Sequence, residues 1–174
     1  MHIIITRPKE DSMQLIAKLK KSGNLVTHLP VIKIEKLETD KINLENYNAV
    51  IFTSSNAIRF MNIKKFNLKI KCFCVGSATE LTAKQAGFIN TYSSEGTVDS
   101  LIELILRILN NKSEKLLYLS SEFISRDLDK DLINQGFLVD RISNYTTLPV
   151  EQIDETTLNI LKKNPPDVFF IYSS

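Results

Sequence analysis

The stretch Ala49-Val50-Ile51-Phe52-Thr53-Ser54-Ser55-Asn56 decides the fold, because an unbroken apolar run ends there in hydroxyl and amide side chains. A continuous β-branched and aromatic run predicts a strand that is covered on both faces, as in a parallel sheet. Ser55 or Asn56 is expected to cap a following helix. The apolar positions expected on that helix are Ile58, Met61 and Ile63.

This junction of strand and helix also predicts a binding site. Open α/β sheets bind ligands outside the carboxyl ends of their strands, where helix N-termini offer unpaired N–H groups. The polar end of the stretch is therefore a candidate anion site. The alternative is that its hydroxyls only cap the helix and face solvent.

The composition argues against several classes of protein. The 174 residues fit one domain or two small ones, and an apolar fraction of 43% supports a core. Lys and Arg number 22 against 20 Asp and Glu, and the net charge of +2 indicates neither a nucleic-acid binder nor a membrane-surface binder. Residues 1–7 resemble neither a signal peptide nor a membrane span, so a cytoplasmic protein is expected.

The cysteines and histidines do not predict a metal site. Cys72 and Cys74 are two residues apart on a strand pattern, which favours a buried, reduced thiol pair over a zinc framework. His2 and His28 lie in or beside apolar strand patterns, where a structural role is the more common one.

Strand and helix patterns alternate along the chain and predict an α/β fold. Strands are expected at residues 3–6, 25–34, 49–52, 70–75, 88–91, 116–119, 138–148 and 168–174. Helices are expected at residues 9–21, after residue 55, from Ser77 to Gly87, from Val98 to Leu109, through Ile124, Leu128 and Leu132 to Gly136, and at residues 154–163. Ser77 with Glu80 has the spacing of a capping box.

The chain contains an internal repeat. An offset of 113 residues aligns residues 3–32 with residues 116–145, and both segments have a strand–helix–Gly–strand layout. A second internal match, at an offset of 119, aligns residues 48–55 with residues 167–174. The repeat indicates two similar α/β halves, and the alternative is two unrelated βαβ stretches with generic patterning.

Short motifs in a fixed order cover nearly the whole chain. They are Ile5-Thr6-Arg7-Pro8, Gly23 with Leu29-Pro30-Val31-Ile32, Ile51 to Ala57, Val75 to Thr79, Gly136 to Val139, Asn144 to Thr147, and Asp167 to Ser174. In this set and order the sequence resembles the uroporphyrinogen-III synthase family.

The resemblance implies two similar α/β domains with parallel sheets, joined by a two-strand hinge. The first domain would comprise residues 1–33 and 149–174, the second residues 38–143, and the hinge strands residues 34–37 and 144–148. Family members usually continue beyond the second Ser block, so the first domain is expected to be incomplete in this chain. The substrate would lie in the cleft between the domains of a monomer.

The resemblance also implies the reaction. The linear tetrapyrrole hydroxymethylbilane, a small-molecule substrate, would lose water and close to uroporphyrinogen III with inversion of ring D, in haem biosynthesis, without cofactor or metal. Tyr145 matches the family's tyrosine that assists departure of the hydroxyl, and a tyrosine can donate a proton or a hydrogen bond there. The alternatives are a hinge tyrosine that only packs and, for the whole chain, a catalytically impaired remnant or a non-catalytic ligand-binding α/β module.

The substrate carries several carboxylates, which fits the polar residues at strand ends and helix starts, where N–H and hydroxyl donors converge. The residues expected to bind these carboxylates are Thr53, Ser54, Ser55, Gly76, Ser77, Thr97, Ser120, Ser121 and Ser174.

Overall fold

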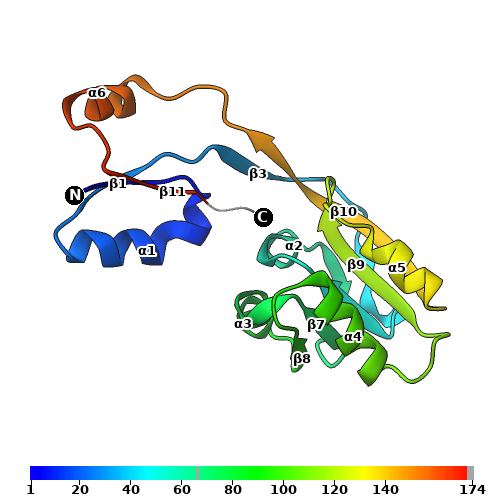
Figure 1. Ribbon diagram of the computed structural model, residues 1–174. Helices are drawn as coiled ribbons and strands as arrows, with labels where there is room; N and C mark the ends of the chain where they lie inside the picture. Colours follow the sequence, from blue (N-terminus) through cyan, green and yellow to red (C-terminus); the bar gives the residue numbers. More distant parts are fainter. Residues whose placement is uncertain (66, 172–174) are drawn as a thin grey trace. The chain divides into compact units, whose positions relative to one another are not determined.

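The computed structural model describes residues 1–65 and 67–171, and the chain divides into two compact units (Figure 1). Unit 1 comprises Met1–Glu35 and Thr147–Ser174, and unit 2 comprises Lys36–Thr146. The chain leaves unit 1 along β3 (Ile32–Lys36) and re-enters it along β10 (Leu138–Pro149). The two units therefore share two strand connections.

Unit 1 is built on a parallel sheet. β1 (His2–Ile5) pairs with β2 (Leu25–His28) on one side and with β11 (Val168–Phe170) on the other. α1 (Lys9–Lys21) lies alongside this sheet in Figure 1 and has the bounds that the sequence predicts. α6 (Glu155–Lys163) is capped by the side chain of Asp154. The apolar side chains in this core are Ile3, Ile5 and Val26, with Leu15, Ile16, Leu19, Val168 and Phe170 packed against them.

Unit 2 is built on a larger sheet, with strand order β3-β10-β9-β5-β7-β8. Its other strands are β5 (Ala49–Phe52), β7 (Lys71–Cys74), β8 (Asn90–Ser93) and β9 (Lys115–Ser121), and all pairs from β10 to β8 are parallel. The helices are α2 (Ser55–Arg59), α3 (Gly76–Gln85), α4 (Val98–Ile108) and α5 (Leu128–Asn134). A short pair, β4 (Ile42–Asn43) with β6 (Ile63–Lys65), and the 3₁₀ turn η1 (Leu44–Asn46) complete the unit. The predicted α/β class with parallel sheets is confirmed.

Both faces of β5 are buried, as its unbroken apolar run predicts. Ala49 and Ile51 face a core formed with Phe73 and with the apolar sides of α4 and α5. Phe52 packs edge-on against Phe88, with ring centroids 5.7 Å apart. Because every residue of β5 is fully buried, this strand lies at the centre of unit 2.

The thiols and the first histidine have the environments expected of structural residues. Cys72 and Cys74 are buried and free, and their Sγ atoms lie 3.8 Å apart. The ring of His2 is buried between the Asn164 carbonyl, 2.6 Å from Nδ1, and the Thr27 hydroxyl, 2.8 Å from Nε2. Among the described residues, no group of three or more His, Cys, Asp or Glu could hold a metal ion.

The internal repeat is preserved in the strand registers. In unit 1, His2 lies opposite Leu25, and the offset of 113 maps this pair onto Lys115 opposite Leu138 in unit 2. The offset of 119 maps Val168 onto Ala49, and the offset of 113 maps its partner Ile3 onto Leu116, which is the partner of Ala49. β11-β1-β2 and β5-β9-β10 are therefore the same arrangement in the same register, which favours a true duplication over generic patterning.

The helix after β5 is shorter than predicted. Ser54 is its cap, rather than Ser55 or Asn56, and the helix ends at Arg59. Met61 lies outside it, and Ile63 lies in β6, which pairs with β4. Apolar residues spaced by three and then two positions also suit a turn followed by a strand, so the pattern alone could not place the end of α2.

Two other predicted helix starts are wrong. α3 is preceded by Val75 and begins at Gly76, so Ser77 and Glu80 form no capping box. α5 begins only at Leu128, so Ile124 is not on it. A capping box is formed instead at the start of α4, between Thr97 and Ser100.

Glu80 has tertiary partners in place of the predicted cap. Its carboxylate accepts hydrogen bonds from Thr91 Oγ1 at 2.9 Å and Ser93 Oγ at 3.0 Å, and pairs with Lys84 at 2.8 Å. These contacts fasten α3 to β8. Within residues 1–65 and 67–171, no helix has both the length and the apolar character needed to cross a membrane.

Replacing Phe73 with alanine is expected to lower the free energy of unfolding by about 3–5 kcal/mol, because the ring is fully buried and stacks on Tyr92. Denaturant unfolding measures the change. The matched control is Phe123→Ala, since Phe123 is 70% exposed and its loss should cost no more than about 0.5 kcal/mol. Equal losses for the two variants would contradict the core described above.

Glu80→Gln is expected to remove part of the acid sensitivity of folding. Lys84 first, and then the two hydroxyls, hold the pKa of Glu80 below its ordinary value of 4.5, against the opposing effect of burial. A depressed pKa stabilises the fold above the unfolded value, and this contribution is lost as the pH falls through the folded value. The stability gap between wild type and Glu80→Gln should therefore be largest near pH 7 and shrink toward pH 3.

Denaturant unfolding across that pH range tests the expectation, with Glu103→Gln on the exposed side of α4 as the control. A gap for Glu80→Gln that does not change with pH would show that the carboxylate charge is not what fastens α3 to β8.

Candidate functional site

The carboxyl ends of β9, β5, β7 and β8 lie along one edge of the unit 2 sheet, because all these pairs are parallel. The predicted site residues of unit 2 follow or end these strands. Thr53, Ser54 and Ser55 follow β5, Gly76 and Ser77 follow β7, Thr97 follows β8, and Ser120 and Ser121 end β9 beside Tyr145 on β10. Ser174 lies outside the described residues.

The three hydroxyls after β5 are already engaged within the protein. Thr53 Oγ1 lies 3.2 Å from the hydroxyl of Tyr118, whose pKa is raised by burial despite the opposing effect of Thr53. Ser54 Oγ accepts the backbone N–H of Asn56 at 3.2 Å and so caps α2. Ser55 Oγ accepts from Thr82 Oγ1 at 3.1 Å. Ser54 therefore has the role of a helix cap, which was the alternative to anion binding. Ser55 instead connects α2 to α3 by a hydrogen bond.

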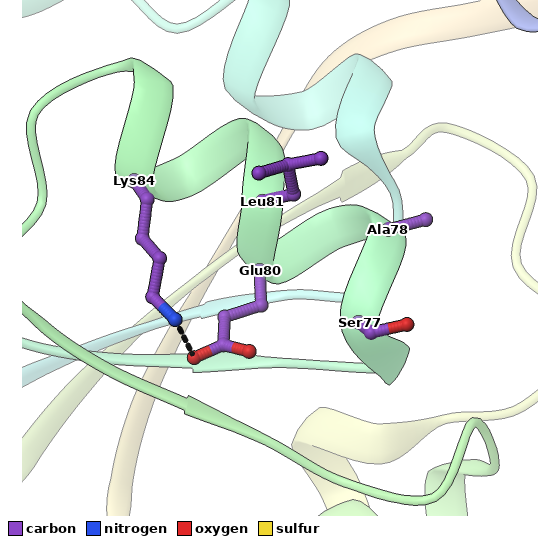
Figure 2. Close-up of a pocket in the computed structure, with 5 residues that line it drawn as sticks. All are labelled: Ser77, Ala78, Glu80, Leu81 and Lys84. Carbon is purple, nitrogen blue, oxygen red and sulfur yellow. Dashed lines mark ion pairs between the residues drawn. The ribbon is translucent and has the colours of Figure 1, made fainter.

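The start of α3 differs from the starts of α2 and α4, which are capped by side chains. Among the described residues, no side chain caps this helix, so its first-turn N–H groups are available to an anion. Gly76 has φ +74, and a Cβ there would lie 3.6 Å from the Cα of Gly96, so the loop before α4 passes close by. Ser77 is exposed at this helix start (Figure 2).

A shallow pocket runs along α3 next to this start. Its lining residues are Ser77, Ala78, Glu80, Leu81 and Lys84, and Figure 2 shows that all of them come from this one helix. The Glu80 carboxylate in it is already neutralised by Lys84 at 2.8 Å. The helix start, rather than the pocket, is therefore the better candidate for binding an anion.

Thr97 has a structural role at the start of α4. Its Oγ1 accepts the backbone N–H of Ser100 at 3.1 Å, and Ser100 Oγ accepts the N–H of Thr97 at 3.3 Å. Asp99, in the same turn, pairs with Arg126. The side chain of Thr97 thus caps its own helix.

The end of β9 contains the most buried polar groups of the site. Ser120 is fully buried, and its Oγ donates to the Ser121 carbonyl at 2.9 Å. Ser121 Oγ is buried without a hydrogen-bond partner in the described part of the chain. Tyr145 lies opposite Ser121 in the β9–β10 register and is 7% exposed. The predicted proton donor thus lies directly beside Ser121, one of the predicted hydroxyl residues.

Sequence reasoning missed two residues at this edge. Arg141 on β10 donates from Nε to Ser120 Oγ at 2.9 Å and from Nη2 to the carbonyls of Ser121 at 2.8 Å and Glu122 at 2.9 Å. The side-chain amide of Asn144 donates to the Ala57 carbonyl at 2.7 Å. The sequence signal for Arg141 is its place in an extended segment that leads to Tyr145, and the signal for Asn144 is its place next to Tyr145.

Comparisons with known proteins agree with this fold. A family model described as uroporphyrinogen-III synthase HemD matches residues 13–174. The chloroplastic uroporphyrinogen-III synthase of Oryza sativa subsp. japonica is 26% identical over 170 residues, covering 90% of this chain and 56% of the relative. The porphyrin biosynthesis protein HemD of Ruminiclostridium josui is 28% identical over 159 residues, covering 83% of this chain and 32% of the relative.

Solved structures show the same fold. Uroporphyrinogen-III synthetase from Helicobacter pylori 26695 superposes with a TM-score of 0.62 at 18% identity, covering 97% of this chain and 72% of that one. A mutant uroporphyrinogen III synthase from Thermus thermophilus gives a TM-score of 0.58 at 15% identity, covering 97% and 71%.

The chain spans about a third of the length of the Ruminiclostridium josui relative and somewhat more than half of the length of the Oryza sativa relative. The family model nevertheless matches all but its first twelve residues. The chain belongs to the uroporphyrinogen-III synthase family.

Proposed function

We propose that this chain acts as a uroporphyrinogen-III synthase, which dehydrates hydroxymethylbilane and closes it to uroporphyrinogen III with inversion of ring D. The observation that carries the proposal is the pairing of Tyr145 with Ser121 at the carboxyl edge of the unit 2 sheet, in a chain of this family. The reaction needs a proton donor near the leaving hydroxyl and a binding surface for carboxylates.

In this proposal, Tyr145 donates to the hydroxyl of the substrate as the C–O bond breaks, and the hydroxyl leaves as water. The resulting cation is attacked by the substituted α-carbon of ring D, which gives a spiro intermediate. The bond from that carbon to its original bridging carbon then breaks, the released bridging carbon bonds to the free α-carbon of ring D, and that carbon loses a proton as the macrocycle closes with ring D inverted. The buried strands around Tyr145 hold its ring in place and keep bulk water away from it. No step assigned to these residues requires a cofactor.

The substrate carboxylates would bind where donors remain available. The start of α3, with Gly76 and Ser77, offers uncapped N–H groups and an exposed hydroxyl. The buried Ser121 Oγ adds a further donor. Roles for Thr53, Ser54, Ser55, Thr97 and Ser174 in binding are part of the same proposal, with Ser54 and Thr97 contributing through the helix starts that they cap.

The domain organisation follows the same family resemblance. We propose that unit 1 and unit 2 correspond to the two domains of the family, with β3 and the end of β10 as the hinge strands. The oligomeric state and the location of the enzyme stay predictions from the sequence, namely a monomer in the cytoplasm.

Purified protein is expected to convert hydroxymethylbilane to the type III isomer, and Tyr145→Phe is expected to slow this conversion by up to about 100-fold, because the proton donor is lost. Oxidation of the products to porphyrins and separation of the type I and type III isomers measures the outcome.

Tyr47→Phe is the matched control for this experiment. Tyr47 donates to Asp140 at 2.9 Å at the opposite, amino-terminal end of the sheet, so its loss should leave the isomer ratio unchanged. Production of only type I isomer at the spontaneous rate by the wild type would favour the alternative of an impaired remnant or a ligand-binding module.

Ser77→Glu is expected to raise the KM for hydroxymethylbilane while stabilising the fold slightly. A carboxylate in the first turn of α3 interacts favourably with the helix dipole but repels the carboxylates of the substrate. Ser77→Gln, of nearly the same size and neutral, should change KM much less. If both variants raise KM equally, bulk rather than charge matters and the helix start does not bind carboxylates.

A further inference from the structure

β10 has one irregularity, immediately before Tyr145. Its pairing with β9 advances residue by residue from Leu138 opposite Lys115 to Ser143 opposite Ser120, and then resumes with Tyr145 opposite Ser121. Asn144 is therefore the extra residue of a β-bulge. Bulges commonly occur next to functional sites, where they redirect a side chain.

This bulge decides which face of the sheet carries the ring of Tyr145. Side chains alternate between faces along a strand, and residues opposite each other in a parallel pair share a face. Without the extra residue, Asn144 would lie opposite Ser121, and Tyr145 would point to the other face. The orientation of the tyrosine therefore depends on whatever holds Asn144 in the bulge.

Two further segments of unit 2 hold Asn144. Its Nδ2 donates to the Ala57 carbonyl in α2 at 2.7 Å, and its backbone carbonyl accepts the N–H of Leu37 at 3.0 Å. Asn144 and Ala57 are both fully buried. Since α2 begins at Ser55, directly after its cap Ser54, the amide of Asn144 joins this helix to the strand that carries Tyr145.

The stability of the fold does not explain why asparagine occupies this position. Asn144 Oδ1 is buried and accepts no hydrogen bond from any residue that the structure describes. A buried polar atom without a partner destabilises the fold, so it requires an explanation beyond packing. The donor half of the same amide supplies one, because it fixes the bulge.

We infer that Asn144 is a positioning residue that sets the orientation of Tyr145 through the bulge, an inference that rests on the proposed synthase function. It acts through Tyr145 and needs no contact with the substrate. Loss of its amide donor should therefore impair the step that Tyr145 assists, rather than substrate binding.

A double-mutant cycle tests the inference. Asn144→Ala should lower kcat for type III product by about 10- to 100-fold with little change in KM, because a small displacement of the proton donor is enough. In the Tyr145→Phe background the same substitution should cause little further loss. Asn144→Leu, which keeps the size but has no donor for the Ala57 carbonyl, should behave like Asn144→Ala. Asn144→Ser, whose hydroxyl is too short to reach the Ala57 carbonyl but keeps a polar group at this position, replaces Asn144→Ala if that variant does not fold.

The matched control is Asn62→Ala. Asn62 also donates its side-chain amide to a backbone carbonyl, that of Thr39 at 3.0 Å, but is not part of β10. It should retain the kcat of the wild type in both backgrounds. Activities are compared per folded molecule, as measured by circular dichroism. Equal loss from Asn144→Ala with and without Tyr145 would show a merely structural role and overturn the inference.

Failure of the proposed function has a different signature. If the wild type makes no type III product, the proposed function fails, and the orientation of Tyr145 is then followed directly in fluorotyrosine-labelled protein. The ¹⁹F resonance of Tyr145, assigned by its loss in Tyr145→Phe, should shift in Asn144→Ala and not in Asn62→Ala. An unchanged resonance in Asn144→Ala would overturn the positioning role whatever the activity.

Discussion

The parallel pairing of β5 with β9 on one side and β7 on the other is the constraint on which unit 2 depends. Every residue of β5 is buried, so both faces must be covered by helices and both edges must be paired. If either pairing slipped by one residue, the side chain of Ile51 would move to the opposite face of the sheet, and its neighbours would take its place. The register is therefore fixed, and with it the edge at which β9, β5, β7 and β8 all end.

The same constraint appears in reduced form in unit 1. β11 pairs with β1 in the register that β5 has with β9, which is what a duplication of one strand–helix–strand element requires. The environments differ, however. Phe169 in β11 is 55% exposed, whereas its counterpart Val50 in β5 is fully buried. Equal sequence patterns thus give equal pairings, while burial depends on how many elements surround the strand.

Hydroxyl groups at the edge of unit 2 serve the fold as well as the proposed site. Ser54 and Thr97 cap helices, and Ser120 shares its hydroxyl with Arg141 and a backbone carbonyl. At each capped helix start, backbone N–H groups still point outward. A helix whose side chain serves as a cap can therefore still bind an anion through its backbone. Tyr145 differs, because its direction is set by the bulge at Asn144 and not by its place in an alternating strand.

By itself the sequence determined the α/β class, most strands, the extent of α1, the repeat and the family, since these depend on local periodicity, on glycines such as Gly23 and on motif order. It also placed the candidate hydroxyls on one sheet edge, because parallel strands end together. Only the tertiary structure decided which of these groups are engaged, and that Glu80 fastens α3 to β8 instead of capping α3. It also showed that Arg141 binds the Ser120 hydroxyl and that Asn144 binds the Ala57 carbonyl. The physical reason is distance along the chain: the amide of Asn144 and the carbonyl of Ala57 are 87 residues apart, and no local pattern specifies a hydrogen bond between segments that only the packed fold brings together.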